Sequence, residues 1–274
     1  MTMKTNIFLK ILATIIAMSY ISSPANSMTL SQSITEEVVT YMSDGVTLKG
    51  IITYDKNLKG KRPAVIVVHE WWGLTDYAKM RAHKLAELGY IAMAADMFGD
   101  GRTAADPNEA QALAMPFYQD PGLAKSRMDA AIKKIKEFSQ TDPNNIAAIG
   151  YCFGGFIVLN SAKLGADLKG VVSFHGGLTG VPLKKELLKA AILVCHGGSD
   201  NFVPLEDYNS LKNKLDSIGA DNTFKIYPGA THAFTNPDAT ENGKKFNMPI
   251  EYNEKADNDS WNDMKVFLTK IFKK

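Results

Sequence analysis

The chain has 274 residues, which is enough for one large α/β domain or two small ones. Residues 1–27 contain two lysines and no acidic residue, so the remainder carries 29 basic and 29 acidic residues. This balance gives no strongly basic surface, and neither nucleic acid nor an anionic membrane is expected as a partner.

The N-terminal segment has the three parts of a secretory signal peptide. Lys4 and Lys10 give it a positively charged start. Residues 11–21 follow as an apolar stretch, which is too short to span a membrane because a spanning helix needs roughly 20 residues. Ala25-Asn26-Ser27 then places small residues before a cut at Met28.

We therefore expect residues 1–27 to be a signal peptide, 28–34 a short N-terminal tail, and 35–274 a single domain. Cleavage near Ser27-Met28 would release a periplasmic or secreted protein with no stable membrane association. An uncleaved N-terminal anchor is the alternative interpretation of the same segment.

Beyond the tail, strand-like and helix-like segments alternate. A hairpin is predicted first, because two alternating segments flank the turn residues Ser43-Asp44-Gly45. The predicted strands are 37–42, 46–54, 64–68, 90–95, 145–150, 170–174, 191–195 and 222–227. The predicted helices are 75–88, one starting at 106, 122–139, 153–164, 204–218 and 253–272. Repeated βα units predict an α/β fold with a mostly parallel sheet and helices on both faces.

The segment Gly150-Tyr151-Cys152-Phe153-Gly154-Gly155 has the pattern of a nucleophile elbow that carries Cys instead of Ser. It joins a predicted strand to a predicted helix, so Cys152 is expected in a strained turn that lifts its side chain above the sheet. Gly150 and Gly154 lie where a Cβ would collide with that turn. The N-terminus of the following helix also favours a thiolate, and Cys152 is the predicted nucleophile.

A thiol nucleophile needs a base within hydrogen-bond reach and a carboxylate that orients the base. In strand–helix hydrolases the chain order is nucleophile, acid, base. Asp200 follows Cys152 just past a predicted strand, and His232 follows Asp200 in a loop after the last predicted strand. Three other histidines at strand ends precede Asp200: His69, His175 and His196. Because the carboxyl ends of parallel strands share one edge, Cys152, Asp200 and His232 are expected to meet there.

Two backbone amides are expected to form an oxyanion hole. One is the N–H of Phe153, and the other candidate is the N–H of Trp71, in the loop after the third predicted strand. Glu70 is unusual beside such a site, because a carboxylate repels the developing charge. We expect Glu70 to hold the thiol of Cys152 protonated, or turned away from His232, until substrate binds. A solvated glutamate at the rim is the alternative.

Aromatic side chains near these positions predict an apolar substrate pocket. The candidates are Trp71, Trp72, Phe98, Tyr118, Phe153 and Phe234, with Arg102 as a further candidate. Core packing is the alternative for most of the aromatic residues. Segments 97–106 and 236–249 are expected to be loops bordering the entrance. Cys195 lies in an apolar strand-like run and is expected to be a buried free thiol.

Together, Glu70, the elbow around Cys152, Gly198-Ser199-Asp200 and Thr231-His232-Ala233-Phe234 resemble the dienelactone hydrolase family of α/β-hydrolases, over about residues 35–272. The resemblance implies an α/β-hydrolase fold and hydrolysis of the ester bond of a small unsaturated lactone.

Carried over residue by residue, the resemblance implies that Cys152 is the nucleophile, His232 the base and Asp200 the residue that orients it. It also implies that Glu70 gates the thiol and that the residues after Glu70 and Cys152 donate to the oxyanion. The arginines that grip the substrate carboxylate in the family's prototype lack a clean counterpart, because none follows His232 and Arg102 is out of register.

We therefore expect a carboxylic ester or lactone hydrolase that works through an acyl-thioenzyme, needs no metal or cofactor, acts on a small molecule and is a monomer. Two alternatives stay open. One is a redox-responsive thiol protein that uses Cys152 alone or paired with Cys195. The other is an inactive hydrolase fold that serves as a binding protein.

Overall fold

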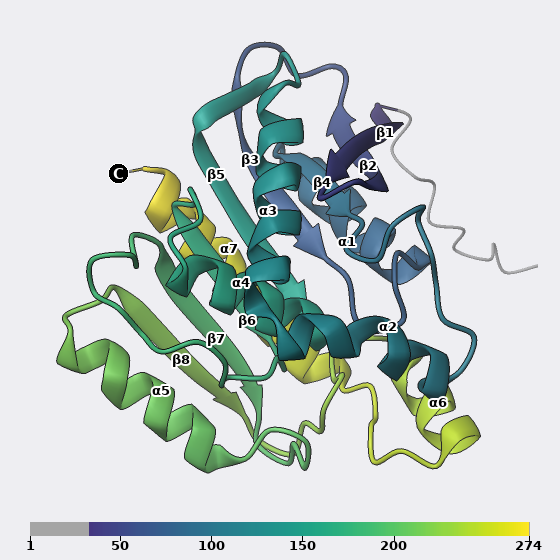
Figure 1. Cartoon of the computed structure of the whole chain (residues 1–274), viewed down its shortest axis with the longest axis vertical. Helices are drawn as coiled ribbons and strands as arrows, with labels where there is room; N and C mark the ends of the chain where they lie inside the picture. Colours follow the sequence, from purple (N-terminus) through teal and green to yellow (C-terminus); the bar gives the residue numbers. More distant parts are fainter. Residues whose placement is uncertain (1–32, 274) are drawn as a thin grey trace, which may run out of the picture. The chain divides into compact units, whose positions relative to one another are not determined.

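The computed structural model describes residues 33–273, and the predicted signal peptide lies outside them. Within the described residues one sheet of eight strands forms the centre, in the order β1-β2-β4-β3-β5-β6-β7-β8 (Figure 1). The strands are β1 Ile34–Ser43, β2 Val46–Asp55, β3 Arg62–Val68, β4 Ile91–Ala95, β5 Thr141–Tyr151, β6 Gly170–Phe174, β7 Ala191–Gly197 and β8 Asn222–Tyr227. The helices are α1 Asp76–Glu87, α2 Pro107–Gln119, α3 Pro121–Lys136, α4 Phe153–Lys163, α5 Leu205–Ser217, α6 Ala239–Phe246 and α7 Glu254–Phe272.

The sheet is mostly parallel, as the repeated βα units predict. β1 and β2 form the predicted antiparallel hairpin, and β2 joins β4 in the antiparallel sense. From β4 through β3, β5, β6 and β7 to β8 every pairing is parallel. The carboxyl ends of these six strands therefore lie along one edge of the sheet, where such folds carry their sites.

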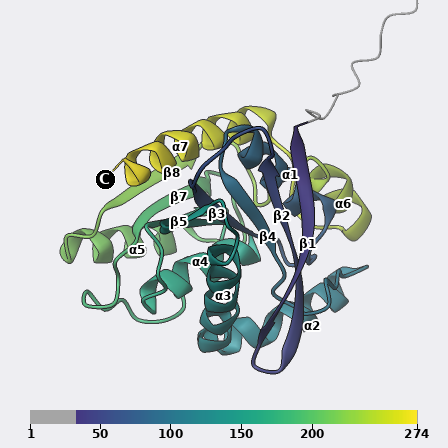
Figure 2. The ribbon, with the colours of Figure 1, turned by 90° about the horizontal axis from the view of Figure 1, so that it is seen from above.

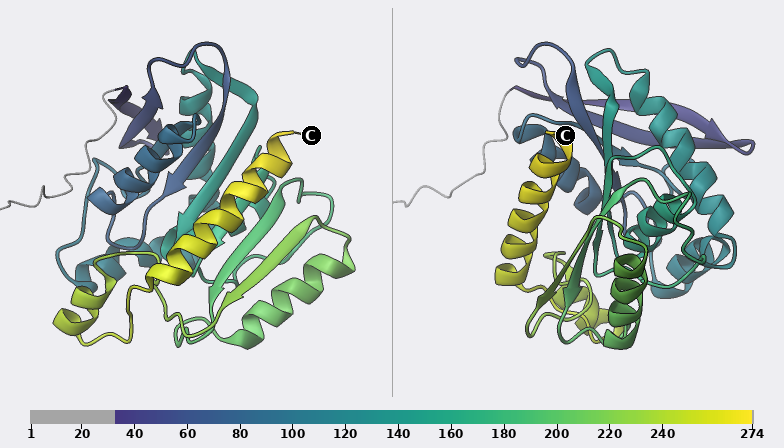
Figure 3. Two further views of the ribbon diagram at one scale, coloured as in Figure 1. Left: turned by 180° about the vertical axis from the view of Figure 1, so that it is seen from behind. Right: turned by 90° about the vertical axis from the view of Figure 1, so that its left-hand side faces the viewer.

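Helices cover both faces of the sheet (Figure 2). Along β3, Val65 and Val67 belong to the apolar cluster that includes residues of α1 and α7, whereas Ile66 and Val68 belong to the cluster that includes residues of α3 and α4. This two-residue alternation is what a strand buried on both faces requires. Figure 3 shows the long helix α7 lying along one face of the sheet. The α/β-hydrolase fold expected from the sequence is confirmed.

Helix α6, Ala239–Phe246, was not predicted, and the expectation of a loop over 236–249 is wrong in this part. The segment carries a glycine inside the helix at Gly243 and ends on Asn247, whose φ of +53° is left-handed. Glycine and asparagine lower the helical signal of so short a segment. α6 is held instead by packing, since a Cβ on Gly243 would come within 2.4 Å of the Ile250 carbonyl.

None of the helices within residues 33–273 is both long enough and apolar enough to cross a membrane.

Candidate active site

Cys152 lies in a sharp turn between β5 and α4. Its φ of +52° and ψ of −113° are sterically unfavourable for any residue with a side chain. The turn closes only because its flanking residues are glycines: a Cβ on Gly150 would lie 2.0 Å from the Gly154 carbonyl oxygen, and one on Gly154 would lie 2.3 Å from that of Val68. The predicted elbow therefore has the conformation that its sequence requires.

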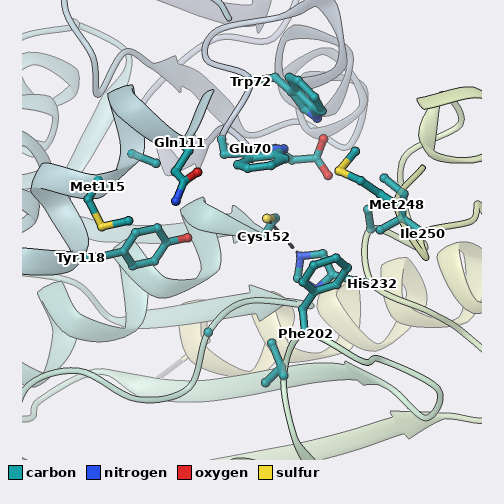
Figure 4. A pocket seen from close by; sticks show the side chains of 15 residues that line it. Glu70, Trp72, Gln111, Met115, Tyr118, Cys152, Phe202, His232, Met248 and Ile250 are labelled. Atoms are coloured by element: carbon teal, nitrogen blue, oxygen red, sulfur yellow. Dashed lines mark hydrogen bonds between the residues drawn. The ribbon is translucent and has the colours of Figure 1, made fainter. Parts of the chain in front are cut away.

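The Cys152 sulfur faces His232. The distance from Sγ to His232 Nε2 is 3.1 Å, and His232 Nδ1 lies 2.9 Å from Asp200 Oδ2 (Figure 4 shows the first of these contacts). The other carboxylate oxygen of Asp200 accepts the backbone N–H groups of Phe202 and Val203, at 2.8 and 3.1 Å. The fold thus brings together the three side chains that the chain order predicted.

The protonation states of His232 and Asp200 depend on each other. Burial lowers the pKa of His232, but the neighbouring Cys152 and the hydrogen bond and charge of Asp200 outweigh it and raise the pKa to about 10. Burial raises the pKa of Asp200, whereas the hydrogen bond and charge of His232 bring it below its ordinary value. The site therefore favours an imidazolium held between a carboxylate and the sulfur.

A second histidine, His175, supports the elbow from behind. The N–H of Cys152 donates to His175 Nδ1 at 3.1 Å as well as to the Phe174 carbonyl at 3.0 Å. Because Nδ1 accepts, the proton is on Nε2, which donates to Thr235 Oγ1 at 2.8 Å. Thr235 lies three residues after His232. His175 therefore connects the backbone of Cys152 to the loop that carries His232.

His175 also belongs to a buried polar network. Burial lowers its pKa well below the ordinary value, so the ring is neutral. Thr235 lies 2.6 Å from the Tyr77 hydroxyl, which accepts from Arg81 Nε at 3.3 Å. Arg81 in turn donates to Asp257 at 2.6 Å. The sequence marks His175 as a histidine at a strand end but indicates no role for it, because its hydrogen-bond partners are distant in the chain.

The N–H groups of the two predicted oxyanion donors, Trp71 and Phe153, point away from the carbonyls of the same peptide groups. Each of these carbonyls accepts hydrogen bonds within the protein. The carbonyl of Glu70 accepts His69 Nδ1–H at 2.6 Å and the N–H of Gly73 at 3.1 Å. The Trp71 N–H of the same trans peptide points the opposite way. The carbonyl of Cys152 accepts from the first turn of α4, which orients the Phe153 N–H likewise. Neither amide has an acceptor among residues 33–273.

Glu70 is buried, at 4% exposure, so the alternative of a solvated rim glutamate is wrong. Its Oε2 accepts Asn236 Nδ2–H at 2.6 Å, and its Oε1 has no partner within the described chain. Burial raises the pKa of Glu70 to about 7, although Asn236 and the charge of His232 act to lower it. The expectation of a thiol turned away from His232 is not met here, because Cys152 faces the imidazole.

A pocket of about 470 Å³ opens onto the Cys152 sulfur (Figure 4). Of the predicted pocket residues, Trp71, Trp72 and Tyr118 line it. Further lining residues, which the sequence did not indicate, come from α2 and from the loops after β7 and α6: Gln111, Ala114, Met115, Phe202, Val203, Met248 and Ile250. Met248 lies within the segment 236–249 that was expected at the entrance.

Four predicted pocket residues do not line this cavity. Phe98 and Phe153 pack against each other in the core, with ring centroids 5.3 Å apart. Phe234 is fully buried and packs against His175 and Tyr227. Arg102 donates to the carbonyls of Phe98 and Gly99 in its own loop. For Phe98, Phe153 and Phe234 the alternative of core packing is correct.

Both cysteines are free thiols, and Cys195 is fully buried as expected. It lies in the apolar cluster on the α1 and α7 side of the sheet, where the Tyr227 hydroxyl is 3.5 Å from its sulfur. The structure thus contains no bridge between Cys152 and Cys195. Within the described chain no group of three or more His, Cys, Asp or Glu side chains is arranged to hold a metal ion.

Comparisons with known proteins agree with the geometry. A family model described as the dienelactone hydrolase family matches residues 48–272. A putative carboxymethylenebutenolidase of Saccharolobus solfataricus is 27% identical over an alignment 272 residues long. The alignment covers 87% of this chain and all of that protein. The crystal structure of a dienelactone hydrolase-like promiscuous phosphotriesterase from metagenomic libraries is 32% identical, with a TM-score of 0.82, over 88% of this chain and 99% of that one. A putative dienelactone hydrolase from Klebsiella pneumoniae has the same fold at 22% identity and a TM-score of 0.73.

The fold and the family define an α/β-hydrolase that acts on carboxylic esters or lactones. The chain belongs to the dienelactone hydrolase family, as its motifs suggested.

Proposed function

We propose that Cys152, His232 and Asp200 act as a catalytic triad that hydrolyses ester or lactone bonds through an acyl-thioenzyme. The observation that carries the proposal is the pair of consecutive contacts, Cys152 Sγ to His232 Nε2 at 3.1 Å and His232 Nδ1 to Asp200 Oδ2 at 2.9 Å. These are the distances at which a base takes a proton from a nucleophile and is oriented by a carboxylate.

In the first step the thiolate attacks the substrate carbonyl carbon, while the Cys152 proton resides on His232. The carbonyl oxygen becomes an oxyanion that accepts from the N–H groups of Trp71 and Phe153. The tetrahedral intermediate collapses, the C–O bond to the alcohol breaks, and His232 Nε2 gives its proton to the leaving oxygen. The product of this half-reaction is a thioester on Cys152.

In the second step water attacks the thioester carbonyl. His232 takes the water proton, and the same two amides stabilise the second oxyanion. The C–S bond then breaks, which releases the carboxylic acid and restores the thiolate beside the imidazolium. For a lactone the alcohol and acid belong to one product molecule.

Glu70 is proposed to regulate this chemistry by its charge. Its backbone carbonyl shares a peptide group with the Trp71 N–H, and its side chain is neutral below its raised pKa of about 7. A neutral Glu70 leaves the oxyanion unopposed, whereas an ionised one repels it. Asn236 holds this carboxyl group through a 2.6 Å hydrogen bond to Oε2.

The test compares two cysteine variants on short-chain p-nitrophenyl esters and small lactones. Cys152→Ala is expected to abolish hydrolysis, with thermal stability nearly unchanged. Cys195→Ala is the matched control, because Cys195 is buried on the other face of the sheet, and it is expected to remain active. An active Cys152→Ala variant would reject the triad. Inactivity of the wild type on every ester and lactone would favour the binding-protein alternative.

A second candidate activity is hydrolysis of neutral phosphotriesters. The likeness to the promiscuous phosphotriesterase, at 32% identity over 88% of this chain, favours it. A thiolate and two amide donors suit attack at a phosphoryl centre as they suit attack at a carbonyl. Release of p-nitrophenolate from diethyl p-nitrophenyl phosphate, absent in Cys152→Ala, is the expected result.

We also propose that the enzyme is exported. Residues 1–27 carry the charged start, apolar stretch and small-residue cleavage pattern of a signal peptide. Intact mass measurement of the protein from the periplasm or medium of its host is expected to give a chain that starts at Met28. A cell-associated chain that keeps residue 1 would contradict the proposal.

A further inference from the structure

We propose that the substrate is an uncharged ester whose acyl half lies against α2 and whose alcohol half lies against Phe202, Met248 and Ile250. This inference rests on the proposed thioester mechanism and adds to it the substrate class and the direction of binding.

The pocket has two sides, and Cys152 lies between them (Figure 4). On one side Gln111, Met115 and Tyr118 project from α2. On the other side are His232 and three apolar residues from loops: Phe202, Met248 and Ile250. The Phe202 ring packs on the His232 ring, with centroids 5.2 Å apart.

The mechanism assigns a role to each side. The leaving oxygen must receive its proton from His232 Nε2, so the alcohol half of the ester has to lie on the His232 side of the sulfur. The acyl half stays bonded to Cys152 after the alcohol departs. It therefore occupies the opposite side, where Met115 and Tyr118 offer an apolar wall and Gln111 a neutral hydrogen-bonding group.

The lining offers a negatively charged substrate no partner. Among the described residues that form the pocket wall there is no arginine or lysine, and the one basic group is His232, which already lies between Asp200 and Cys152. Burying a carboxylate without a paired cation is costly. A substrate with a carboxylate in either half is therefore disfavoured.

The raised pKa of Glu70 shows that this pocket disfavours a negative charge. It lines the cavity, its Oε1 has no partner within residues 33–273, and its burial raises its pKa to about 7. A carboxyl group that belongs to the protein is thus driven towards its neutral form at this wall. A carboxylate brought in by the substrate meets the same desolvation and, when Glu70 is ionised, repulsion as well.

The test uses matched ester pairs at pH 7, with phenol release as the readout. Phenyl hexanoate and monophenyl adipate have acyl halves of equal chain length and differ by a terminal carboxylate. 4-Acetoxybenzamide and 4-acetoxybenzoate differ by a carboxylate in the alcohol half. In each pair the charged ester is expected to show at least about tenfold lower kcat/KM. Equal values within either pair would overturn the uncharged substrate class.

Two variants test the direction of binding. Met115→Arg places a cation on the α2 side and is expected to raise kcat/KM for monophenyl adipate relative to phenyl hexanoate, with the 4-acetoxybenzoate to 4-acetoxybenzamide ratio unchanged. Met248→Arg is expected to raise kcat/KM for 4-acetoxybenzoate relative to 4-acetoxybenzamide, with the monophenyl adipate to phenyl hexanoate ratio unchanged. Gln111→Arg, at an exposed position on α2, repeats the first test without burying a charge. If Met115→Arg and Gln111→Arg improve only the alcohol-half pair, the assigned direction is wrong.

These results separate from failure of the proposed function. If no neutral ester in the panel is hydrolysed, or if Cys152→Ala hydrolyses them, the triad mechanism fails. If the neutral esters are hydrolysed through Cys152 but the charged partners react as fast, only the inference about the pocket fails.

Discussion

Asn236 donates a buried 2.6 Å hydrogen bond to the carboxyl group of Glu70, the residue before Trp71, whose N–H is the proposed oxyanion donor. The two residues are 166 positions apart, on loops that follow β3 and β8. Their contact joins the loop of the proposed oxyanion hole to the loop of His232. The pKa of Glu70 therefore depends on how these two loops pack together.

This contact predicts a pH dependence. Burial raises the pKa of Glu70 to about 7, against the opposing effects of Asn236, His232 and Arg81. Above that pH Glu70 becomes an anion beside the oxyanion, so kcat for a neutral p-nitrophenyl ester is expected to fall as the pH rises through about 7. In Glu70→Gln this fall is expected to disappear. Superimposable pH profiles for wild type and Glu70→Gln would contradict the role.

Asn236→Ala provides a second readout of the same group. Its amide lowers the pKa of Glu70, so its removal is expected to move the fall in kcat to higher pH. A variant whose fall stays in place, or moves to lower pH, would show that Glu70 is not the titrating group.

His175 is expected to be a positioning residue. His175→Ala removes an acceptor of the Cys152 N–H and the link to Thr235. Since one hydrogen bond contributes about 1 kcal/mol, we expect kcat to fall by about fivefold. KM is expected to stay nearly constant, because His175 does not line the pocket. Steady-state kinetics measure kcat and KM, and the rate of iodoacetamide alkylation measures the reactivity of the Cys152 thiol.

His196→Ala is the matched control for that experiment. His196 is also a buried histidine at a strand end, but it packs on Tyr208 and makes no hydrogen bond to the triad within the described chain. It is expected to keep kcat within about twofold. A comparable loss of kcat in both variants would indicate a general loss of stability and not a specific effect on the elbow.

The elbow glycines are expected to be essential for folding. In Gly150→Ala the new Cβ would lie 2.0 Å from the Gly154 carbonyl oxygen, and backbone cannot move aside cheaply. We expect the free energy of unfolding to drop by about 3 kcal/mol or more, measured by denaturant titration. Gly177→Ala, whose new Cβ would meet nothing closer than 3.6 Å, is expected to cost less than about 1 kcal/mol. Equal stability of the two variants would contradict the steric account.

The proximity of Cys152, Asp200 and His232 could be predicted because each is marked by a local pattern. The elbow motif fixes the turn at Cys152 through glycines two residues away, and Asp200 and His232 lie just past apolar strands in the required order. Parallel strands share their carboxyl edge, so proximity follows from topology alone. Local sequence patterns also explain why the strands and the long helices could be predicted.

The pocket wall could be predicted only in part, because it depends on how helices and loops pack. Phe98 lies three residues after β4 and packs in the core against His69, whereas Tyr118, near the end of α2, lines the pocket that Cys152 also lines. Both are aromatic residues in nearby segments, and nothing local distinguishes them. Asn236 lies four residues after His232, yet its partner Glu70 is set by tertiary structure.

The central claim is that Cys152 carries the acyl group, and peptide mapping by mass spectrometry tests it most directly. Wild type and Cys195→Ala, quenched with acid during turnover of a p-nitrophenyl ester, are expected to gain the mass of one acyl group on the peptide that contains Cys152. Cys152→Ala is expected to gain none. An acyl group on a serine, or on any residue of a Cys152→Ala protein that still hydrolyses the ester, would contradict the account.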